Sequence, residues 1–487
     1  MERGRYSYIM VSLLICISIS VSILSIFTPI EYGVYTQHTY DLQHIFRGNK
    51  TDYRGKVLRL IDEIKSSVSS IRGLKFSKEL NVVFINTSWA LEQWAPKSEN
   101  ESSIPIDMLY REKIYKMTFI APYNFSIVSG QRSWIAMFMA AVAGTTIYIN
   151  TDYFNPDDRS VRNILSHELT HVLQFLNLNI YHNPNTTDSQ LAFSALIEGD
   201  AGYTQHLYCI TTGLCKPSPP TFIDLSNLYL SINLFPYIYG ENFIRYLYNY
   251  YGNWTLVNRA YDKPPISTSM VMHPERYIAY LFNGSFTPER IAIPYCYTGN
   301  PSYIDTLGEY YLLLILAPVI GLENASTISS GWNGDRISLY LVNKSEGYEK
   351  WVLCWNISFF SMDNAKNVFS SMERVVRRYM ENVSTLENNT IISSTIKRID
   401  NKIVFHGMKI YLDGKYIFMY SEYEERYNVS SNKISTITPT PNTSLTATTS
   451  NRTITSTILA IDWKVTIVLA IALLIIGFVI GYLVKLK

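Results

Sequence analysis

Two histidines and a glutamate in the first half of the sequence have the types and spacing of a metal-dependent hydrolase. His167, Glu168 and His171 form an HExxH pattern within the stretch 160–176, where apolar residues recur at helical spacing. On a helix, residues four apart lie on one face, so both imidazoles would project together. They could chelate one zinc ion, and Glu168 could take a proton from a water molecule bound to it.

A zinc site of this kind needs a third protein ligand, and Glu198 is the candidate. It lies in the stretch 191–203, which is predicted to be a second helix, and its neighbour Gly199 would allow close helix contact. Two histidines and one glutamate, with the fourth position left to water, are typical of a catalytic zinc site. The alternative, that these side chains are solvated on helix surfaces, fits less well with a chain that has only 8 histidines.

The segments before this motif are predicted to alternate between helix and strand. We expect a helix over 54–72, strands at 80–86, 115–121 and 144–150, and a core helix over 132–143. The last strand runs almost directly into the HExxH helix. A sheet edge would then lie beside the cleft, where an extended peptide could add itself as a further strand.

From about residue 300 the sequence predicts a different set of secondary-structure elements. A helix is predicted over 305–316, strands over 337–342 and 351–359, and an amphipathic helix over 363–379. Asp413-Gly414 predicts a hairpin within 402–420. These elements predict a small α+β unit packed behind the helical part.

Composition excludes one class of partner. The chain has 487 residues, of which 47% are hydrophobic and 17% charged, and its net charge is +2. This length allows two domains and a large core. Because there is no basic excess, we predict no nucleic-acid partner.

Both ends of the chain carry long apolar runs. The uncharged run 8–27 follows Arg3 and Arg5 and predicts a signal peptide or signal anchor, whereas the apolar run 465–484 predicts a transmembrane helix. The basic residues beyond each run place the ectodomain outside the cell and the C-terminus in the cytoplasm, at the cell membrane. Gly477 and Gly481 have the spacing of a helix-pairing face, which indicates either a homodimer or an incidental pattern.

Three further features of the sequence are those expected of an extracellular protein. Asn-x-Ser/Thr sequons recur from Asn49 to Asn451 and predict N-glycans. The Ser/Thr-rich segment 428–457 predicts a stalk. Four cysteines outside the N-terminal apolar run allow three pairings; the short spacing of Cys209 and Cys215 favours a local bridge, which leaves Cys296 with Cys354. Four buried thiols are the alternative.

The motifs together resemble a known class of enzyme. The segments 167–174 and 195–201 resemble the gluzincins, the thermolysin-like grouping of zinc metallopeptidases. More closely, roughly residues 145–420 are similar to a group of prokaryotic secreted or membrane-anchored gluzincin-like proteins. The further shared segments are 264–268, 273–275, 305–309 and 331–336.

The resemblance implies a role for each motif residue. His167, His171 and Glu198 would be the Zn²⁺ ligands and Glu168 the general base. Thermolysin-like enzymes orient a ligand histidine with an aspartate four residues after the ligand glutamate, but that position is Gly202 here. Tyr203 and His273 are candidates for stabilising the oxyanion, with purely structural roles as the alternative for both.

The predicted fold class is α+β: a zincin-like (gluzincin) domain with an HExxH helix, then a small α+β subdomain, with an N-terminal signal or anchor and a C-terminal transmembrane helix. The predicted function is a cell-surface zinc endopeptidase that acts on peptide or protein substrates. The alternatives are a non-catalytic structural or adhesive surface protein and a zinc hydrolase of cell-wall or glycan amides. The predicted segments are 1–30 (signal or anchor), 31–290 (metallopeptidase domain), 291–426 (subdomain), 427–460 (stalk) and 461–487 (transmembrane helix).

Overall fold

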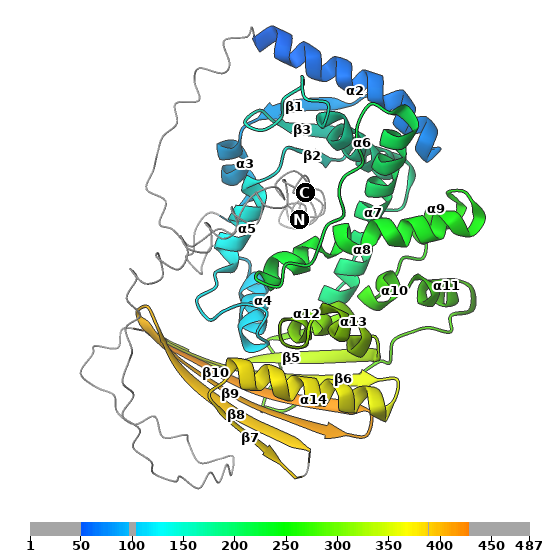
Figure 1. The fold of residues 1–487 in the computed structure, drawn as a ribbon. Helices are drawn as coiled ribbons and strands as arrows, with labels where there is room; N and C mark the ends of the chain where they lie inside the picture. The colour runs from blue at the N-terminus through cyan, green and yellow to red at the C-terminus, as the bar shows by residue number, and fades with distance from the viewer. Residues whose placement is uncertain (1–49, 97–103, 388, 428–487) are drawn as a thin grey trace, which may run out of the picture. The chain divides into compact units, whose positions relative to one another are not determined.

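The computed structural model describes residues 50–96, 104–387 and 389–427 (Figure 1). The predicted N-terminal signal or anchor segment, the stalk from residue 428 onward and the predicted transmembrane helix with Gly477 and Gly481 lie outside the described residues. Within the described ranges, no helix is both long and apolar enough to cross a bilayer. This finding contradicts the transmembrane part of the predicted fold class and the predicted location at the cell membrane.

The N-terminal part is built on a three-stranded sheet. Strand β3 (Thr146–Asn150) lies in its centre, parallel to β1 (Asn81–Ile85) and antiparallel to β2 (Ala140–Ala143). Helices α2 (Lys50–Arg72) and α6 (Val161–Asn177) share one hydrophobic core with this sheet. Three further helices connect β1 to β2: α3 (Thr87–Trp94), α4 (Ile106–Met117) and α5 (Ile127–Ala136).

Two predictions for this part are wrong. The segment 115–121, predicted as a strand, forms the end of α4 and the turn after it. Its apolar residues Tyr115 and Met117 are buried in the main core, so helix packing overrides the strand preference of Tyr115. The segment 132–143, predicted as one helix, divides into the end of α5 and the edge strand β2.

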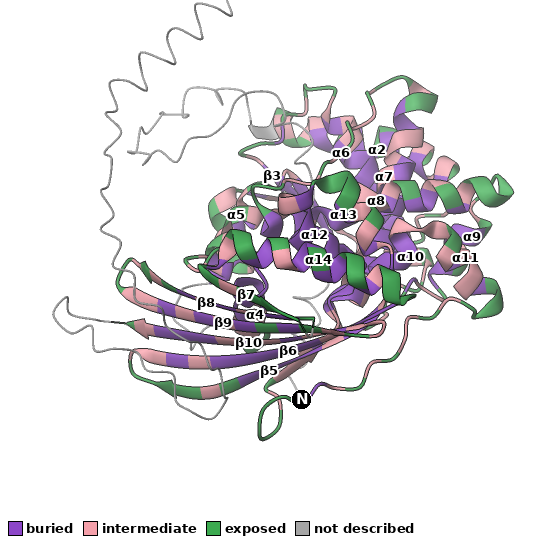
Figure 2. Cartoon of the chain, turned by 60° about the horizontal axis from the view of Figure 1, so that its bottom comes forward, coloured by how far each residue is buried: buried purple, intermediate pink, exposed green. Residues whose placement is uncertain are grey.

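A group of helices forms the middle of the molecule. The longest is α7 (Thr187–Thr212), which packs against α2, α6 and α8 (Leu228–Tyr251) and reaches into both main hydrophobic cores. Figure 2 shows that the buried residues concentrate along the facing sides of these helices. The remaining members are α9 (Thr255–Ala260), α10 (Thr268–Met272), α11 (Pro274–Asn283), α12 (Gly308–Ile320) and α13 (Leu322–Ser329).

The C-terminal part is a seven-stranded antiparallel sheet, with α14 (Met362–Tyr379) lying along one face (Figures 1 and 2). Its size corrects the prediction of a small α+β unit. One hydrophobic core includes side chains from this sheet and from the helices on the other side of the predicted boundary at 290. In spatial order the strands are β4 (Tyr303–Asp305), β5 (Trp332–Ser345), β6 (Tyr348–Phe359), β10 (Tyr416–Tyr427), β9 (Lys402–Asp413), β8 (Thr390–Ile399) and β7 (Asn382–Leu386).

Buried carboxylates connect the helices to this sheet. Asp188, near the start of α7, accepts hydrogen bonds from the backbone N and Oγ1 of Thr268 at 2.7 and 2.6 Å. Asp335 of β5 accepts from the backbone N of Leu307 and Gly308 at 2.9 and 2.8 Å. A Cβ on Gly308 would lie 1.9 Å from Asp188 Oδ1, so only glycine fits there. The shared segments 264–268, 305–309 and 331–336 therefore meet in one structural junction.

This junction should make stability depend on pH. Burial raises the pKa of Asp188 to about 8, and the nearby carboxyls of Asp335 and Glu309 add to the rise. Because the folded state holds this proton more tightly, the stabilising contribution of Asp188 is complete below its ordinary pKa and disappears as the pH rises through 8. We expect the titration of Asp188 alone to lower the free energy of unfolding by roughly 2 kcal/mol between pH 6 and pH 8.

Urea denaturation at both pH values measures this change. Asp188→Asn is isosteric with the protonated acid and should reduce the total fall by this amount, while Glu168 and His171, whose pKa values are also raised, account for the fall that remains. An Asp188→Asn protein that retained the full slope would assign the titration to another group.

Candidate metal centre

Helices α6 and α7 bring three predicted ligands to one point. His167 Nε2 lies 3.1 Å from Glu198 Oε2, and His171 Nε2 lies 3.4 Å from the same oxygen. Each of the three residues offers a ligand atom within 4.8 Å of the other two, and all three side chains are buried. In the described part of the chain this is the one group of His, Cys, Asp or Glu residues with metal-ligand spacing.

The pattern of α6 explains why its histidines face α7. Val161, Leu165, Leu169 and Val172 are buried in the core that α6 shares with the three-stranded sheet. This apolar face fixes the rotation of the helix. The prediction of an amphipathic helix that carries both histidines is confirmed.

A close helix crossing fixes the position of Glu198. The next residue, Gly199, packs against Gly240 of α8, and a Cβ on Gly199 would lie 2.2 Å from the carbonyl oxygen of Gly240. A Cβ on Gly240 would likewise lie 2.5 Å from the carbonyl oxygen of Ala195. The two helices therefore meet backbone to backbone beside the third ligand.

Gly199→Ala should consequently separate α7 from α8. We expect it to reduce the free energy of unfolding by about 3 kcal/mol, because backbone atoms would have to move. The matched control is Gly202→Ala on the same helix, where the nearest atom to a new Cβ is 3.8 Å away. This control should be neutral or stabilising by about 0.5–1 kcal/mol, since alanine favours helix. Equal destabilisation of both variants in urea denaturation would contradict the crossing.

His171 is held by a chain of buried hydrogen bonds. Its Nδ1 lies 2.8 Å from Gln174 Oε1. Gln174 Nε2 donates to the carbonyl oxygen of Ile197 at 2.9 Å and to Asp200 Oδ2 at 3.2 Å. Both of those partners can only accept, so the amide oxygen of Gln174 must face His171 and accept from Nδ1–H. In the neutral imidazole the lone pair of His171 is then on Nε2, the nitrogen nearer Glu198.

Asp200 is the next residue in this series of hydrogen bonds. It forms a fully buried ion pair with Arg72 of α2, with Nε–Oδ1 at 2.7 Å, and accepts a hydrogen bond from the hydroxyl of Tyr261 at 2.8 Å. Asp200 therefore acts on His171 only through Gln174. The resemblance implies an aspartate in direct contact with a ligand histidine, at the position that is Gly202 here. Gly202 has no side chain, and His171 is instead supported by Gln174 and, through it, by Asp200.

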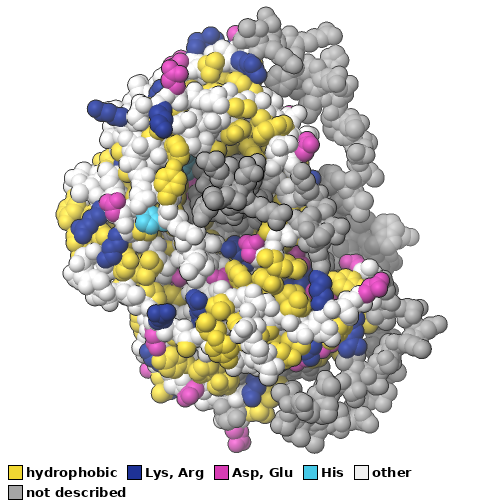
Figure 3. Space-filling view, turned by 180° about the vertical axis from the view of Figure 1, so that it is seen from behind, with side chains coloured by type: hydrophobic (Ala, Val, Ile, Leu, Met, Phe, Trp, Pro, Cys, Tyr) yellow, Lys and Arg dark blue, Asp and Glu magenta, His cyan; other side chains and the backbone are white. Residues whose placement is uncertain are grey.

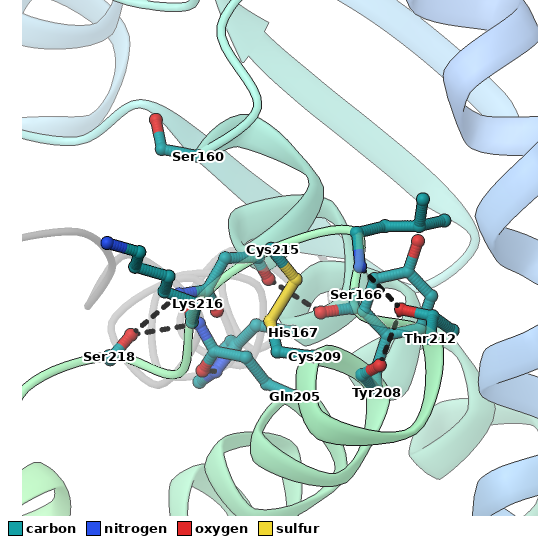
Figure 4. The surroundings of a disulfide bond; sticks show 12 residues. Ser160, Ser166, His167, Gln205, Tyr208, Cys209, Thr212, Cys215, Lys216 and Ser218 are labelled. Carbon is teal, nitrogen blue, oxygen red and sulfur yellow. Dashed lines mark hydrogen bonds between the residues drawn. A yellow bond between two sulfur atoms is a disulfide. The ribbon is translucent and has the colours of Figure 1, made fainter.

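A second glutamine holds His167. The Nδ1 of His167 lies 3.1 Å from Gln205 Oε1, and Gln205 Nε2 donates to Ser218 Oγ at 3.2 Å (Figure 4). Nε2 of His167, like that of His171, is thereby directed to Glu198. Each histidine thus has its own outer support, the kind of partner that fixes the tautomer of a metal ligand.

Glu168 lies beside this group with its carboxylate buried. Its side chain is 0% exposed, and neither oxygen has a hydrogen-bond partner among the described residues. Burial raises the pKa of Glu168 to about 8, while the charge on His171 opposes the rise. An unpaired buried carboxyl is costly, so its presence indicates a partner such as water or a cation.

The ligands influence one another electrostatically. Burial acts to lower the pKa of His171, but the carboxylate of Glu198 outweighs it and raises this pKa to about 9. Burial acts to raise the pKa of Glu198, but His171 and His167 lower it to about 2. Without metal, a proton on His171 therefore balances the charge of Glu198, and a metal ion would displace that proton.

A cavity of about 490 Å³ opens onto His167 and Glu198. Its walls are the first turns of α6, the loop 213–221 and part of α8, which includes Tyr237 and Glu241. Of the remaining predicted site residues, Tyr203 packs against Tyr248 and Trp254, and His273 Nε2 lies 2.7 Å from Glu309 Oε1. The structure does not place Tyr203 or His273 on this cavity.

These residues fit a zinc ion. Two donor atoms bound at about 2.0–2.1 Å to one tetrahedral zinc ion lie roughly 3.3 Å apart, close to the 3.1 and 3.4 Å observed. Two neutral imidazoles and one carboxylate are ordinary zinc ligands. The cavity reaches two of the three residues, His167 and Glu198.

Sequence reasoning missed the supporting residues. Gln174 follows His171 by three positions and Gln205 follows Glu198 by seven, so helical spacing places each on the same side as its ligand. That spacing could have identified them. Arg72 and Ser218 come from distant parts of the sequence and carry no such signal.

Figure 3 shows how charged side chains are distributed on one face of the molecule. On the face shown in Figure 3, acidic and basic side chains are interspersed rather than separated by sign. This agrees with the net charge of +2.

Comparison with known proteins identifies one partial match. The family model described as the eCIS core domain, an extracellular contractile injection system family, matches residues 131–177. This segment contains most of α5, then β2, β3 and α6 with His167, Glu168 and His171, but it ends before Glu198. No curated protein and no solved structure matches the chain. The chain therefore carries an eCIS-core-like segment, which neither confirms nor excludes the gluzincin resemblance.

Proposed function

We propose that this protein is a zinc-dependent hydrolase of peptide bonds. The observation that carries the proposal is the buried carboxyl of Glu168, which lacks a hydrogen-bond partner in the described ranges and adjoins three ligand residues. A structural zinc site is usually closed by four protein ligands and needs no extra acid. Three ligands with an adjacent acid and a cavity favour a catalytic site.

Each residue of the site would have a separate role in the reaction. His167, His171 and Glu198 would hold the ion, which when bound would make water more acidic and polarise a substrate carbonyl. Glu168 would accept a proton from the attacking water and pass it to the leaving amine nitrogen as the C–N bond breaks. The products are a carboxylate and an amine, so no other reactant is required.

The edge strand β2 suggests how a peptide could lie. It packs against α6, and β3 is its only strand partner in the described ranges. Ala140, Ala141 and Val142 of β2 are buried, so an extended peptide could pair with the other side of this strand, along the metal helix, only if the part of the chain that covers it moved aside. The sequence predicted this role for the strand 144–150, but that strand, β3, lies in the centre of the sheet.

Metal content and hydrolysis test the proposal together. We expect about one zinc per chain after reconstitution of wild type, no zinc in Glu198→Ala, and cleavage of a fluorogenic peptide library by wild type alone. Elemental analysis and fluorescence measure the two properties. The matched control is Glu241→Gln, which changes another carboxyl on the same cavity and should retain zinc.

The outcomes separate the proposal from its alternatives. Wild type without zinc would reject the metal site. Wild type with zinc but without cleavage of any peptide would favour a metal that only braces α6 and α7. Cleavage that persists in Glu198→Ala would place the activity elsewhere.

A further inference from the structure

A disulfide lies next to the support of His167. Cys209, in the last turn of α7, is bonded to Cys215, in the loop 213–221 that follows the helix (Figure 4). The sequence favoured this local pairing, and the structure confirms it together with Cys296–Cys354. All of the loop 213–221 lines the cavity that opens onto His167 and Glu198.

The same loop supplies the last member of the His167 support. Ser218 Oγ accepts a hydrogen bond from Gln205 Nε2 at 3.2 Å and another from Asn163 Nδ2 at 3.0 Å. Asn163 Nδ2 also donates to the carbonyl oxygen of Lys216 at 3.1 Å. Asn163 lies one turn before His167 on α6, so the loop is attached to both ligand-bearing helices beside the first ligand.

We propose that the Cys209–Cys215 disulfide holds this loop in place and thereby positions His167 for metal binding, so that reduction of the bridge weakens the metal site. The reaction is an exchange with a dithiol: two electrons and two protons pass to the cystine, its S–S bond breaks, and the dithiol becomes a disulfide. The inference rests on the proposed metal site but not on peptide hydrolysis.

Few other contacts could hold the loop after reduction. Lys216, Pro219 and Pro220 are exposed, and the hydrogen bonds around Ser218 are only partly buried. Opening the bridge frees the loop from α7 and increases its conformational entropy. Gln205 would then lose the partner that orients its amide, and His167 would lose the fixed hydrogen bond at its Nδ1.

The effect should be confined to one ligand. His171 is held through Gln174 and Asp200, which are fully or almost fully buried. Within the described part of the chain, the hydrogen bonds of these two side chains do not involve the loop 213–221. Loss of an outer support typically weakens metal binding about 10–100-fold. Because two of three ligands keep their positions, we expect the lower end, about 10-fold.

Serine variants test the inference without thiols that could themselves bind zinc. Cys209→Ser/Cys215→Ser should raise the zinc Kd about 10-fold in a competition titration. The matched control is Cys296→Ser/Cys354→Ser, which removes the other bridge and should leave the Kd unchanged. In that control protein, reduction with a dithiol and its removal by gel filtration should reproduce the 10-fold change.

A second readout does not need metal. In ¹⁵N-imidazole NMR of the metal-free protein, the Nδ1 resonance of His167, assigned through His167→Gln, should show the hydrogen bond to Gln205, and this signature should be lost in Cys209→Ser/Cys215→Ser. His171 should be unchanged. Retention of the His167 Nδ1 signature and of the wild-type Kd in the folded variant would overturn the inference. Wild type that binds no zinc would reject the proposed function, and the Nδ1 signature would still decide whether the bridge positions His167.

Discussion

Glu168→Gln is expected to lower kcat/KM for peptide hydrolysis by about 10²–10⁴-fold, the range typical of a lost general base, while zinc content stays at one per chain. Glutamine has the shape of glutamate but cannot accept a proton from water. The three ligands are unchanged, so metal binding should survive. Because the buried carboxyl has no hydrogen-bond partner among the described residues, its neutral replacement should not destabilise the fold.

Initial rates on the best substrate of the peptide library, measured beside zinc content, check this expectation. Glu241→Gln is the control, because Glu241 also lines the cavity but is paired with Arg245. It should retain activity within a few-fold. If Glu168→Gln cleaves at the wild-type rate with zinc bound, Glu168 is not the base.

The meeting of His167, His171 and Glu198 could be predicted because the two histidines belong to one short motif and the glutamate to a helix expected soon after it. His167 and His171 are related by a single helical turn, and Glu198 lies in a stretch whose small residues indicate close packing. Their supports depend on tertiary structure: Asp200 and Arg72 are 128 positions apart, and Ser218 belongs to a loop. Tyr203 and His273 were predicted from residue type alone. Both side chains pack against other residues and do not line the cavity.

The size of the C-terminal sheet could not be predicted for a related reason. Its hairpin at Asp413-Gly414 and the helix α14 have strong local signals and are confirmed. The sequences of β7 and β8 lack the regular alternation of apolar and polar residues that predicts a strand. β7 is also largely exposed. β8 belongs to the sheet because it pairs with β9, and β7 because it pairs with β8, and a local sequence pattern contains neither partner.

The largest effect on stability is expected for Asp200→Asn. Asp200 and Arg72 are both 0% exposed, and Arg72 also lies 4.2 Å from the ring centre of Trp254. Removing one charge of a buried pair leaves the other unbalanced in a poorly solvated place, which costs about 3–5 kcal/mol. Asparagine keeps the shape and an acceptor, so the loss would come from charge rather than from a void.

Thermal and urea unfolding of the metal-free protein measure this loss independently of zinc. The control is Asp157→Asn, which breaks an exposed ion pair between the same helix, α2, and the segment before α6. That pair should contribute less than about 1 kcal/mol. Adding Arg72→Met to Asp200→Asn should recover part of the stability, because the unbalanced guanidinium is gone. If Asp200→Asn proved as stable as the wild type, the buried ion pair could not be the contact that anchors α2 to α7. Asp200 would then contribute nothing to the support of His171 beyond that of Gln174.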